Sequence, residues 1–321
     1  MRESELLQRI RAIFDRPSAQ SNNSQSNNSG QDQLIVGNGD DGAIFRTSDS
    51  GVVVATDVAV EGVHFRKEWS SGFEIGRKIT AANLADICAM GGWPTFLLVS
   101  AVIPDTWIDQ AEKIAQGIVY ESDLVGAQVI GGDLSTGRDL TISITALGNV
   151  EHQLLRSGAR VGESVVVSSI PGWSAAGLSL LKSGSSLNSP LAQRAISQHK
   201  SPNLEYAKYR SAFSALTSAT DISDGLLIDA GHIADASGVS IDLDSSLLVD
   251  AELSQLGDSR EWILSGGEDH VLLGTTSEPE KCPGFIVIGT VKARGESAVV
   301  IDGKKIDSAG FQHEWRSSDE R

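Results

Sequence analysis

The chain has 321 residues, and its 26 Lys and Arg against 42 Asp and Glu give a formal net charge of −16 at pH 7. This acidity argues against a nucleic-acid-binding protein, because such proteins neutralise phosphates with a basic surface. The length suggests about two domains, and a hydrophobic content of 40% is enough to form globular cores. The excess acid is either a solvated surface or a means of holding cations, and the placement of the aspartates decides between these.

The hydrophobic pattern predicts an opening helix over 2–16, followed by a flexible linker, 18–33, that is rich in Ser, Asn and Gln. Further helices are expected at 76–90, 107–125, 178–182 and 226–236, with a loop at 171–177. Strands are expected at 52–56, 96–103, 128–132, 140–147, 164–168, 239–243, 271–275, 285–291 and 298–301. The pattern begins afresh after Asn149, so we predict an α+β protein with a helix and linker (1–33), an N-terminal domain (34–149) and a C-terminal domain (150–321).

The cysteine content and the N-terminus indicate a protein of the cytoplasm. Cys88 and Cys282 cannot form a disulfide framework, and no Cys-x-x-Cys pair is present for zinc or redox chemistry. The first residues alternate charged and apolar side chains instead of forming the apolar core of a signal peptide. The most apolar run, 95–104, is about half of the ~20 residues that a membrane span requires. We therefore expect a soluble, cytoplasmic protein that contacts no membrane.

Two glycine-rich segments resemble nucleotide-binding loops but do not meet the requirements of those motifs. The segment 37–42 matches G-x-G-x-x-G, but a turn and a strand are expected after it where that motif requires a helix. Its Asp40 and Asp41 suit a divalent cation, although an ordinary Asp-Gly hairpin turn explains them equally well. The segment 132–139 has the glycine spacing of a P-loop but lacks its Lys and Ser/Thr, so it is not one.

Carboxylates recur beside glycines in both halves of the chain. Asp133 follows two glycines at the end of a predicted strand, and 266–269 holds two glycines followed by two carboxylates. Asp221 and Asp224 flank Ser223 before a predicted helix, where an N-cap explains one aspartate but not both. Such recurrence at strand ends favours a shared site for several metals over a solvated surface.

The first half contributes further candidates. Asp57 follows Thr56 at the end of a predicted strand, and His64 lies shortly after it, although a histidine in isolation is more often structural than a substrate contact. Asp86 lies one turn from Asn83 on an Ala-rich helix, where a buried carboxylate needs a partner, and a metal is one candidate.

Aspartate clusters without His or Cys favour Mg²⁺ or Ca²⁺ over zinc, and Mg²⁺ commonly joins carboxylates to substrate phosphates. These segments therefore predict chemistry between phosphates. Arg156 and Arg160, near the expected domain boundary, are candidates for binding phosphate oxygens, with a surface arginine as the alternative for each.

The ordered segments resemble those of the thiamine-monophosphate kinases, a family of the aminoimidazole-ribonucleotide-synthetase-like superfamily. The resemblance runs from about 34 to 311 through 39–43, 56–65, 83–86, 130–133, 156–160, 174–178, 221–225 and 265–269. It implies the two-domain fold of that superfamily, a homodimer formed through the sheet of the N-terminal domain, and transfer of the γ-phosphoryl group of ATP to thiamine monophosphate.

The resemblance also assigns site residues by matching positions. It implies that several Mg²⁺ ions are held by Asp41, Thr56, Asp57, Asp86, Asp133, Asp221 and Asp224. It implies that the nucleotide contacts Gly132, Asp133, Arg156 and Ser223, and that thiamine monophosphate contacts His64, Glu268 and a C-terminal aromatic, Phe311 or else Trp315. No catalytic side chain is expected, because the acceptor is itself a phosphate and direct in-line transfer assisted by Mg²⁺ needs no general base.

Two alternatives stay open. One is another ATP-using enzyme of the superfamily, although the first 87 residues lack the cysteine that selenophosphate synthetase would need. The chain also ends Ser-Ser-Asp-Glu-Arg and not in the C-terminal cysteine of a hydrogenase-maturation dehydratase. The other alternative is a non-catalytic module that binds divalent cations with the same aspartates and does not turn over ATP.

Overall fold

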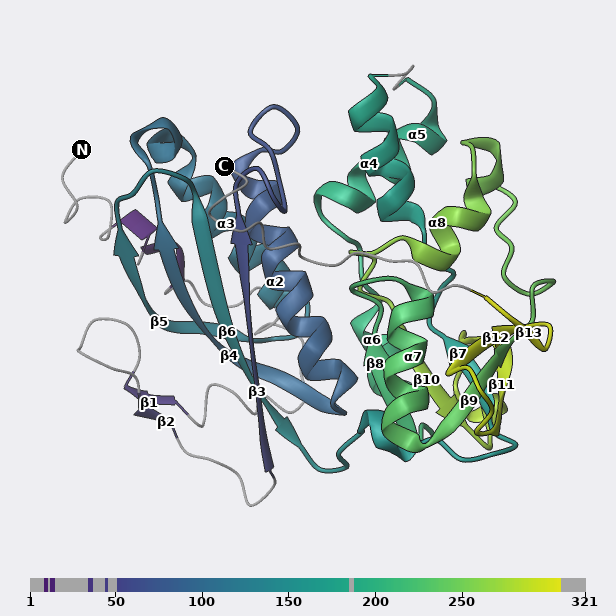
Figure 1. Cartoon of the computed structure of the whole chain (residues 1–321). Coiled ribbons are helices and arrows are strands. Elements are labelled where there is room, and N and C mark those ends of the chain that lie inside the picture. Colours follow the sequence, from purple (N-terminus) through teal and green to yellow (C-terminus); the bar gives the residue numbers. More distant parts are fainter. Residues whose placement is uncertain are drawn as a thin grey trace, which may run out of the picture.

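The computed structural model describes residues 9, 10, 12–14, 34–36, 44–45, 51–184 and 188–306. The predicted linker and the segment 37–42 lie outside these residues, whereas the described part of the predicted first helix is helical. Within the described ranges, every helix is too short or too polar to cross a membrane. Figure 1 shows the chain as two sheet-and-helix halves that lie side by side with helix α2 between them.

The first half is built on a four-stranded sheet in the order β3-β6-β4-β5. Its strands are β3 (Gly51–Val60), β4 (Gly92–Val102), β5 (Gln128–Ser135) and β6 (Thr141–Val150). β6 pairs antiparallel with both β3 and β4, and β4 pairs parallel with β5. The inward-facing residues of β6 are fully buried and alternate with half-exposed ones, so one face of the sheet is covered. A separate hairpin joins β1 (Leu34–Val36) to β2 (Ile44–Phe45).

Helices α2 (Gly72–Ala89) and α3 (Ala111–Asp123) cover that face, with a 3₁₀ helix η2 (Asp105–Gln110) before α3. α2 begins at Ser71, whose side chain accepts from the backbone of Glu74 while Glu74 bonds back to the Ser71 backbone in a capping box. The two helices cross in backbone contact, because a Cβ at Gly76 would lie 2.1 Å from the Ile114 oxygen and one at Gly117 would lie 2.1 Å from the Phe73 oxygen.

The second half is built on a seven-stranded sheet in the order β13-β12-β9-β11-β7-β10-β8. Its strands are β7 (Ser164–Val167), β8 (Ser218–Asp221), β9 (Val239–Leu243), β10 (Leu272–Thr276), β11 (Ile286–Ala293), β12 (Val299–Ile301) and β13 (Lys304–Lys305). All neighbours pair antiparallel except β12 with β9. Its helices are α4 (Trp173–Ser183), α5 (Pro190–Lys200), α6 (Tyr206–Ala212), α7 (Leu226–Ser237) and α8 (Ser259–Ser265), with short 3₁₀ turns η3 (Arg156–Gly158), η4 (Leu253–Gln255) and η5 (Pro279–Lys281).

α2 belongs to the packing of both halves. It contacts β3 and β6 on one side and α6 and β8 on the other, and its apolar residues share one core with the second half. A buried polar network reinforces this contact: Glu121 on α3 receives Arg77 Nε at 2.8 Å and the hydroxyl of Tyr206 on α6 at 2.8 Å. Because Glu121 is fully buried and both its oxygens are bonded, the network links the halves without an unpaired charge.

The expected strands and helices are present, with three corrections. α4 begins at Trp173, so the loop expected at 171–177 is wrong beyond its first residues. The reason is a tertiary contact. The buried Asp269, far along the chain, accepts from the backbone N–H of Gly172 at 2.7 Å and of Ser174 at 3.0 Å. It therefore provides hydrogen-bond acceptors for N–H groups at the start of α4 that have no partner within the helix. Helices α5, α6 and α8 were not predicted, and Asp133 lies within β5, which runs past it to Ser135.

The α2–α3 crossing gives a test of packing. We expect Gly117→Ala to lower the free energy of unfolding by about 1–3 kcal/mol, because the new methyl group overlaps the Phe73 carbonyl and the helices must separate. Gly231→Ala is the matched control, since this α7 glycine has only Val299 nearby, at 3.9 Å, and should gain about 0.5–1 kcal/mol of helix stability. Urea unfolding followed by circular dichroism measures both, and equal stability of the two variants would contradict the close crossing.

Candidate active site

A cavity of about 660 Å³ lies where α2 and the end of β3 face the second half. Its walls come from β3, the loop 62–69, α2, α4 and the loops 221–224 and 265–270. The cavity therefore joins segments from both halves of the chain that the sequence placed in separate motifs.

Three carboxylates gather at one end of this cavity: Asp57 on β3, Asp86 on α2 and Asp221 at the end of β8. Burial, together with the charges of Asp221 and Asp57, raises the pKa of Asp86 to about 8. Burial likewise raises the pKa of Asp57, which shares a side-chain hydrogen bond with Asp86. At neutral pH the cluster thus keeps a proton on Asp86, because three buried negative charges so close together repel one another.

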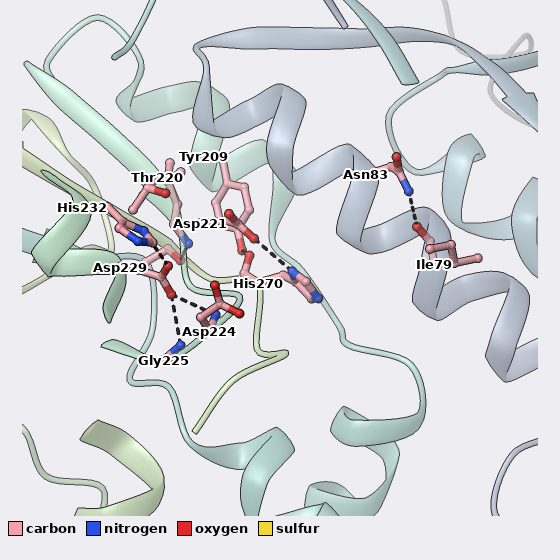
Figure 2. A network of polar contacts seen from close by, with 12 residues as sticks. Ile79, Asn83, Tyr209, Thr220, Asp221, Asp224, Gly225, Asp229, His232 and His270 are labelled. Carbon is pink, nitrogen blue, oxygen red and sulfur yellow. Dashed lines mark hydrogen bonds and ion pairs between the residues drawn. The ribbon is translucent and has the colours of Figure 1, made fainter. Parts of the chain in front are cut away.

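His270 lies beside these carboxylates and was not predicted as a site residue. Its Nδ1 lies 3.0 Å from Asp221 Oδ2, and both side chains are buried (Figure 2). Burial lowers the pKa of His270, but the hydrogen bond and charge of Asp221 outweigh burial and raise it. Asp221 therefore favours the protonated form of the imidazole. The signal in the sequence was its position directly after Glu268 and Asp269.

A second buried carboxylate shapes the loop 221–225. Asp229 on α7 accepts from the backbone N–H of Asp224 at 3.0 Å and of Gly225 at 3.1 Å (Figure 2). Its other oxygen lies 3.6 Å from His232 Nδ1. Burial, together with the charge of Asp221, raises the pKa of Asp229 to about 7. The loop turns at Gly225, where φ is 124° and a Cβ would lie 2.8 Å from the Ser265 oxygen.

This geometry corrects the N-cap interpretation of the loop. The N-cap position of α7 is Gly225, so neither Asp221 nor Asp224 caps the helix, and the loop N–H groups are bonded by Asp229 instead. Asp221, Ser223 and Asp224 are left to line the cavity.

Asn83 and Thr56 do not line the cavity, whereas Asp57 does. Asn83 is fully buried and accepts from the Asp57 backbone N–H at 3.2 Å while donating to Ile79 O at 2.8 Å, so it ties β3 to α2. Successive strand residues point to opposite faces, and the Thr56 hydroxyl donates to Ile144 O at 3.0 Å. The structure therefore brings the Asp57 carboxylate to the cavity and not the Thr56 hydroxyl.

The two expected acceptor contacts, His64 and Glu268, both line the cavity. His64 Nδ1 accepts from the Val60 backbone N–H at 3.0 Å. The Glu268 backbone donates to Ser223 O at 2.8 Å, and its φ of 64° lies in the left-handed region. Burial raises the pKa of the Glu268 carboxyl, but the charge and hydrogen bond of the Lys78 ammonium, together with the nearby His199 and His270, outweigh burial and lower it, so the side chain carries negative charge.

The expected nucleotide contacts are only partly brought together. Ser223 lines the cavity, whereas Gly132, Asp133 and Arg156 do not. Arg156 Nε lies 3.3 Å from Thr220 Oγ1, and its charge lowers the pKa of Asp86, so it lies near the acidic end. Gly132 must be glycine, because a Cβ would lie 1.8 Å from the Val99 oxygen. The positions Asp41, Phe311 and Trp315 lie outside the described residues.

The described side chains fit a hydrated divalent cation better than a closed metal cage. In the described ranges, no group of three or more His, Cys, Asp or Glu side chains is placed so that it could hold a metal ion. The donors at the acidic end are carboxylate oxygens whose mutual repulsion keeps a proton on Asp86. Mg²⁺ suits such a site, because it prefers oxygen and keeps several waters beside one or two carboxylates.

Two further cavity residues were missed. Lys78 lies on α2 with the spacing 78, 82, 86 that places it on the same face as Asp86, a signal that the sequence did contain. His199 lies on α5, a helix that was not predicted, so nothing in the sequence placed it. Burial, followed by the Lys78 ammonium, lowers the pKa of His199 to about 3, so its imidazole is neutral at neutral pH.

Comparisons with known proteins identify the class of this fold. Residues 39–150 match the family model of the AIR synthase related protein, N-terminal domain. The solved thiamine-monophosphate kinase of Stenotrophomonas maltophilia has a TM-score of 0.80 at 28% identity and covers 95% of this chain and 98% of its own. The structure is thus an AIR-synthase-like α+β fold, as the sequence predicted.

The family follows from closer relatives. A thiamine-monophosphate kinase of Corynebacterium glutamicum is 39% identical over 87% of this chain and 88% of its own length. The solved structure of AaThiL complexed with AMPPCP and TMP has a TM-score of 0.78 at 32% identity, covering 85% of this chain and 90% of its own. The chain belongs to the thiamine-monophosphate kinase family and is a kinase.

Proposed function

We propose that the protein transfers the γ-phosphoryl group of ATP to thiamine monophosphate, which forms thiamine diphosphate and ADP. The observation that carries this proposal is one cavity that joins the carboxylates Asp57, Asp86 and Asp221 to His64 and Glu268. The relatives support the substrates, since the curated kinases are named for thiamine monophosphate and the AaThiL structure holds AMPPCP and TMP.

The chemistry fits a site without a general base. The acceptor phosphate is largely deprotonated at neutral pH because its second pKa is ~6, so no side chain has to remove a proton. The barrier lies in the repulsion between two polyanions and in their alignment. Bound Mg²⁺ would supply charge neutralisation and alignment between them.

The residues divide into three proposed roles. We assign Asp57, Asp86, Asp221 and Asp224 to Mg²⁺, together with Asp133 and Asp41 by matching positions. Thr56 is left out of this set, because its hydroxyl donates to Ile144 O and not to the cavity. Gly132, Asp133, Arg156 and Ser223 would bind the nucleotide. His64 and Glu268 would hold the acceptor, where an ionised Glu268 complements the positive thiazolium and the amino group of thiamine. A C-terminal aromatic, Phe311 or Trp315, would cover the thiamine.

The assay that tests this function measures ADP release with ATP and Mg²⁺ in the presence of thiamine monophosphate, free thiamine, or neither. We expect rapid ADP release with thiamine monophosphate alone, with thiamine diphosphate as the second product. The proposed acceptor is a phosphate that needs no general base, whereas the hydroxyl of free thiamine needs one, so strong turnover on free thiamine would contradict the proposal.

The same assay separates the metal-cluster role from a general effect of charge. Asp57→Asn should lower kcat by about 100-fold or more, because it removes a carboxylate that neutralises the reacting phosphates through Mg²⁺. Asp105→Asn, at an exposed position outside the cavity, should retain activity. Equal activity of the two variants would contradict the assignment of Asp57.

The proposal includes a homodimer that forms through the N-terminal sheet. The face of this sheet opposite α2 and α3 exposes Val54 (59%), Val58 (48%) and Leu98 (38%), and nothing in the described chain covers them. A second copy would remove this apolar surface from water. The net charge of −16 supports the further expectation that nucleic acid is not a partner.

Analytical ultracentrifugation tests the dimer. We expect the wild-type protein to sediment as a dimer and Val54→Glu to sediment as a monomer, because a carboxylate would be buried at the contact. Val249→Glu is the control, since Val249 is 63% exposed and lies far along the chain from the sheet. A monomeric wild-type protein, or an unchanged dimer in Val54→Glu, would exclude this interface.

A further inference from the structure

Lys78 is a nearly buried lysine in the wall of the cavity and has no role in the proposed reaction so far. Its side chain is only 10% exposed, yet it lies on α2 among apolar neighbours such as Ile75 and Ile79. A lysine is almost never buried unless its charge is paired. The groups that pair with Lys78 therefore indicate the role of a positive charge at this position.

The two described partners of Lys78 are the two residues expected to hold the acceptor. Its Nζ lies 3.0 Å from Glu268 Oε1 and donates to the backbone oxygen of His64 at 3.1 Å. His64 belongs to the loop after β3 in the first half, whereas Glu268 belongs to the loop before β10 in the second half. One ammonium group thus joins the two loops across the cavity.

The surroundings of Glu268 show that this side chain needs such support. Its backbone has a φ of 64°, which an L-residue adopts only when neighbouring contacts hold it there. The other carboxylate oxygen, Oε2, lies 3.6 Å from Nδ1 of His199, a ring that also lies 3.1 Å from Ser174 Oγ. Since His199 is neutral, Lys78 is the cation that fixes the carboxylate.

We propose that Lys78 is a positioning residue of the acceptor subsite, which holds the Glu268 carboxylate and the His64 loop at the spacing that thiamine monophosphate requires. This inference rests on the proposed function. α2 packs against elements of both halves, whereas the two acceptor contacts lie on loops. Lys78 therefore fixes the positions of His64 and Glu268 relative to the helix. Lys78 acts through Glu268 and takes no part in the phosphoryl transfer.

Steady-state kinetics of Lys78→Met test this role. The change keeps the length of the side chain and removes its charge, so the KM for thiamine monophosphate should rise by about 30-fold or more. The KM for ATP should change by less than about 3-fold, because the nucleotide contacts lie elsewhere. Lys78→Arg keeps the charge and donors and should recover most of the acceptor affinity. An unchanged acceptor KM in Lys78→Met would overturn the proposal.

A double-mutant cycle distinguishes positioning from direct contact. If Lys78 acts through Glu268, then Lys78→Met combined with Glu268→Gln should raise the acceptor KM no more than about 3-fold above the worse single variant. If Lys78 instead binds the acceptor phosphate itself, the two fold-changes multiply, and that result would overturn the positioning role.

Lys200→Met is the matched control for a loss of contact between the halves. Lys200 on α5 lies 3.6 Å from Glu74 on α2 and so also joins the two halves, but it does not line the cavity. Its acceptor KM should stay within about 2-fold of the wild type, because this pair contacts neither His64 nor Glu268. An increase equal to that of Lys78→Met would overturn the proposal. Failure of the proposed function is separate, since the wild-type protein would then not phosphorylate thiamine monophosphate at all.

Discussion

The repulsion among Asp57, Asp86 and Asp221 is the constraint on which the rest of the site depends. Three carboxylates from β3, α2 and β8 meet in a partly closed cavity, and burial together with mutual charge raises the pKa of Asp86 to about 8. Such an arrangement lowers stability unless other groups hold it, as is common where function requires strain. His270 forms a hydrogen bond with Asp221, and Asn83 fixes the backbone of Asp57.

α2 turns this local constraint into a property of the whole chain. Its capping box fixes where it begins, and the glycine contact with α3 fixes how closely the two helices approach. Its core residues pack against both halves. One face of the helix then presents Lys78 toward Glu268 and Asp86 toward Asp57 and Asp221. The acidic end and the acceptor end of the cavity are therefore set by a single rigid element, which explains how loops from both halves reach a common geometry.

The sequence predicted the carboxylates at the acidic end of the cavity better than the residues that hold the site in place. Asp57, Asp221 and Asp224 stand at predicted strand ends or beside glycine, and Asp86 stands among alanines on a predicted helix, so the local pattern was enough to find them. Lys78 and His270 stand near predicted site residues, but their partners, like the partner of His199, are distant in sequence. The bonds from Asp269 to the start of α4 are equally distant, so local pattern could not predict these contacts. Strand positions were predictable because alternation is local, whereas α5 and α6 depend on packing against other elements.

The most direct test of the account is the thermal midpoint of unfolding of wild-type protein and Asp86→Asn, with and without MgCl₂ at matched ionic strength. Without divalent cations and at pH 9, where a pKa of about 8 leaves Asp86 mostly ionised, Asp86→Asn should unfold at a higher temperature than the wild type, because one of three repelling carboxylates is gone. Adding Mg²⁺ should stabilise the wild type clearly more than the variant. A wild-type midpoint that does not respond to Mg²⁺, or an equal response in the variant, would contradict a cation-binding carboxylate cluster as the centre of this site.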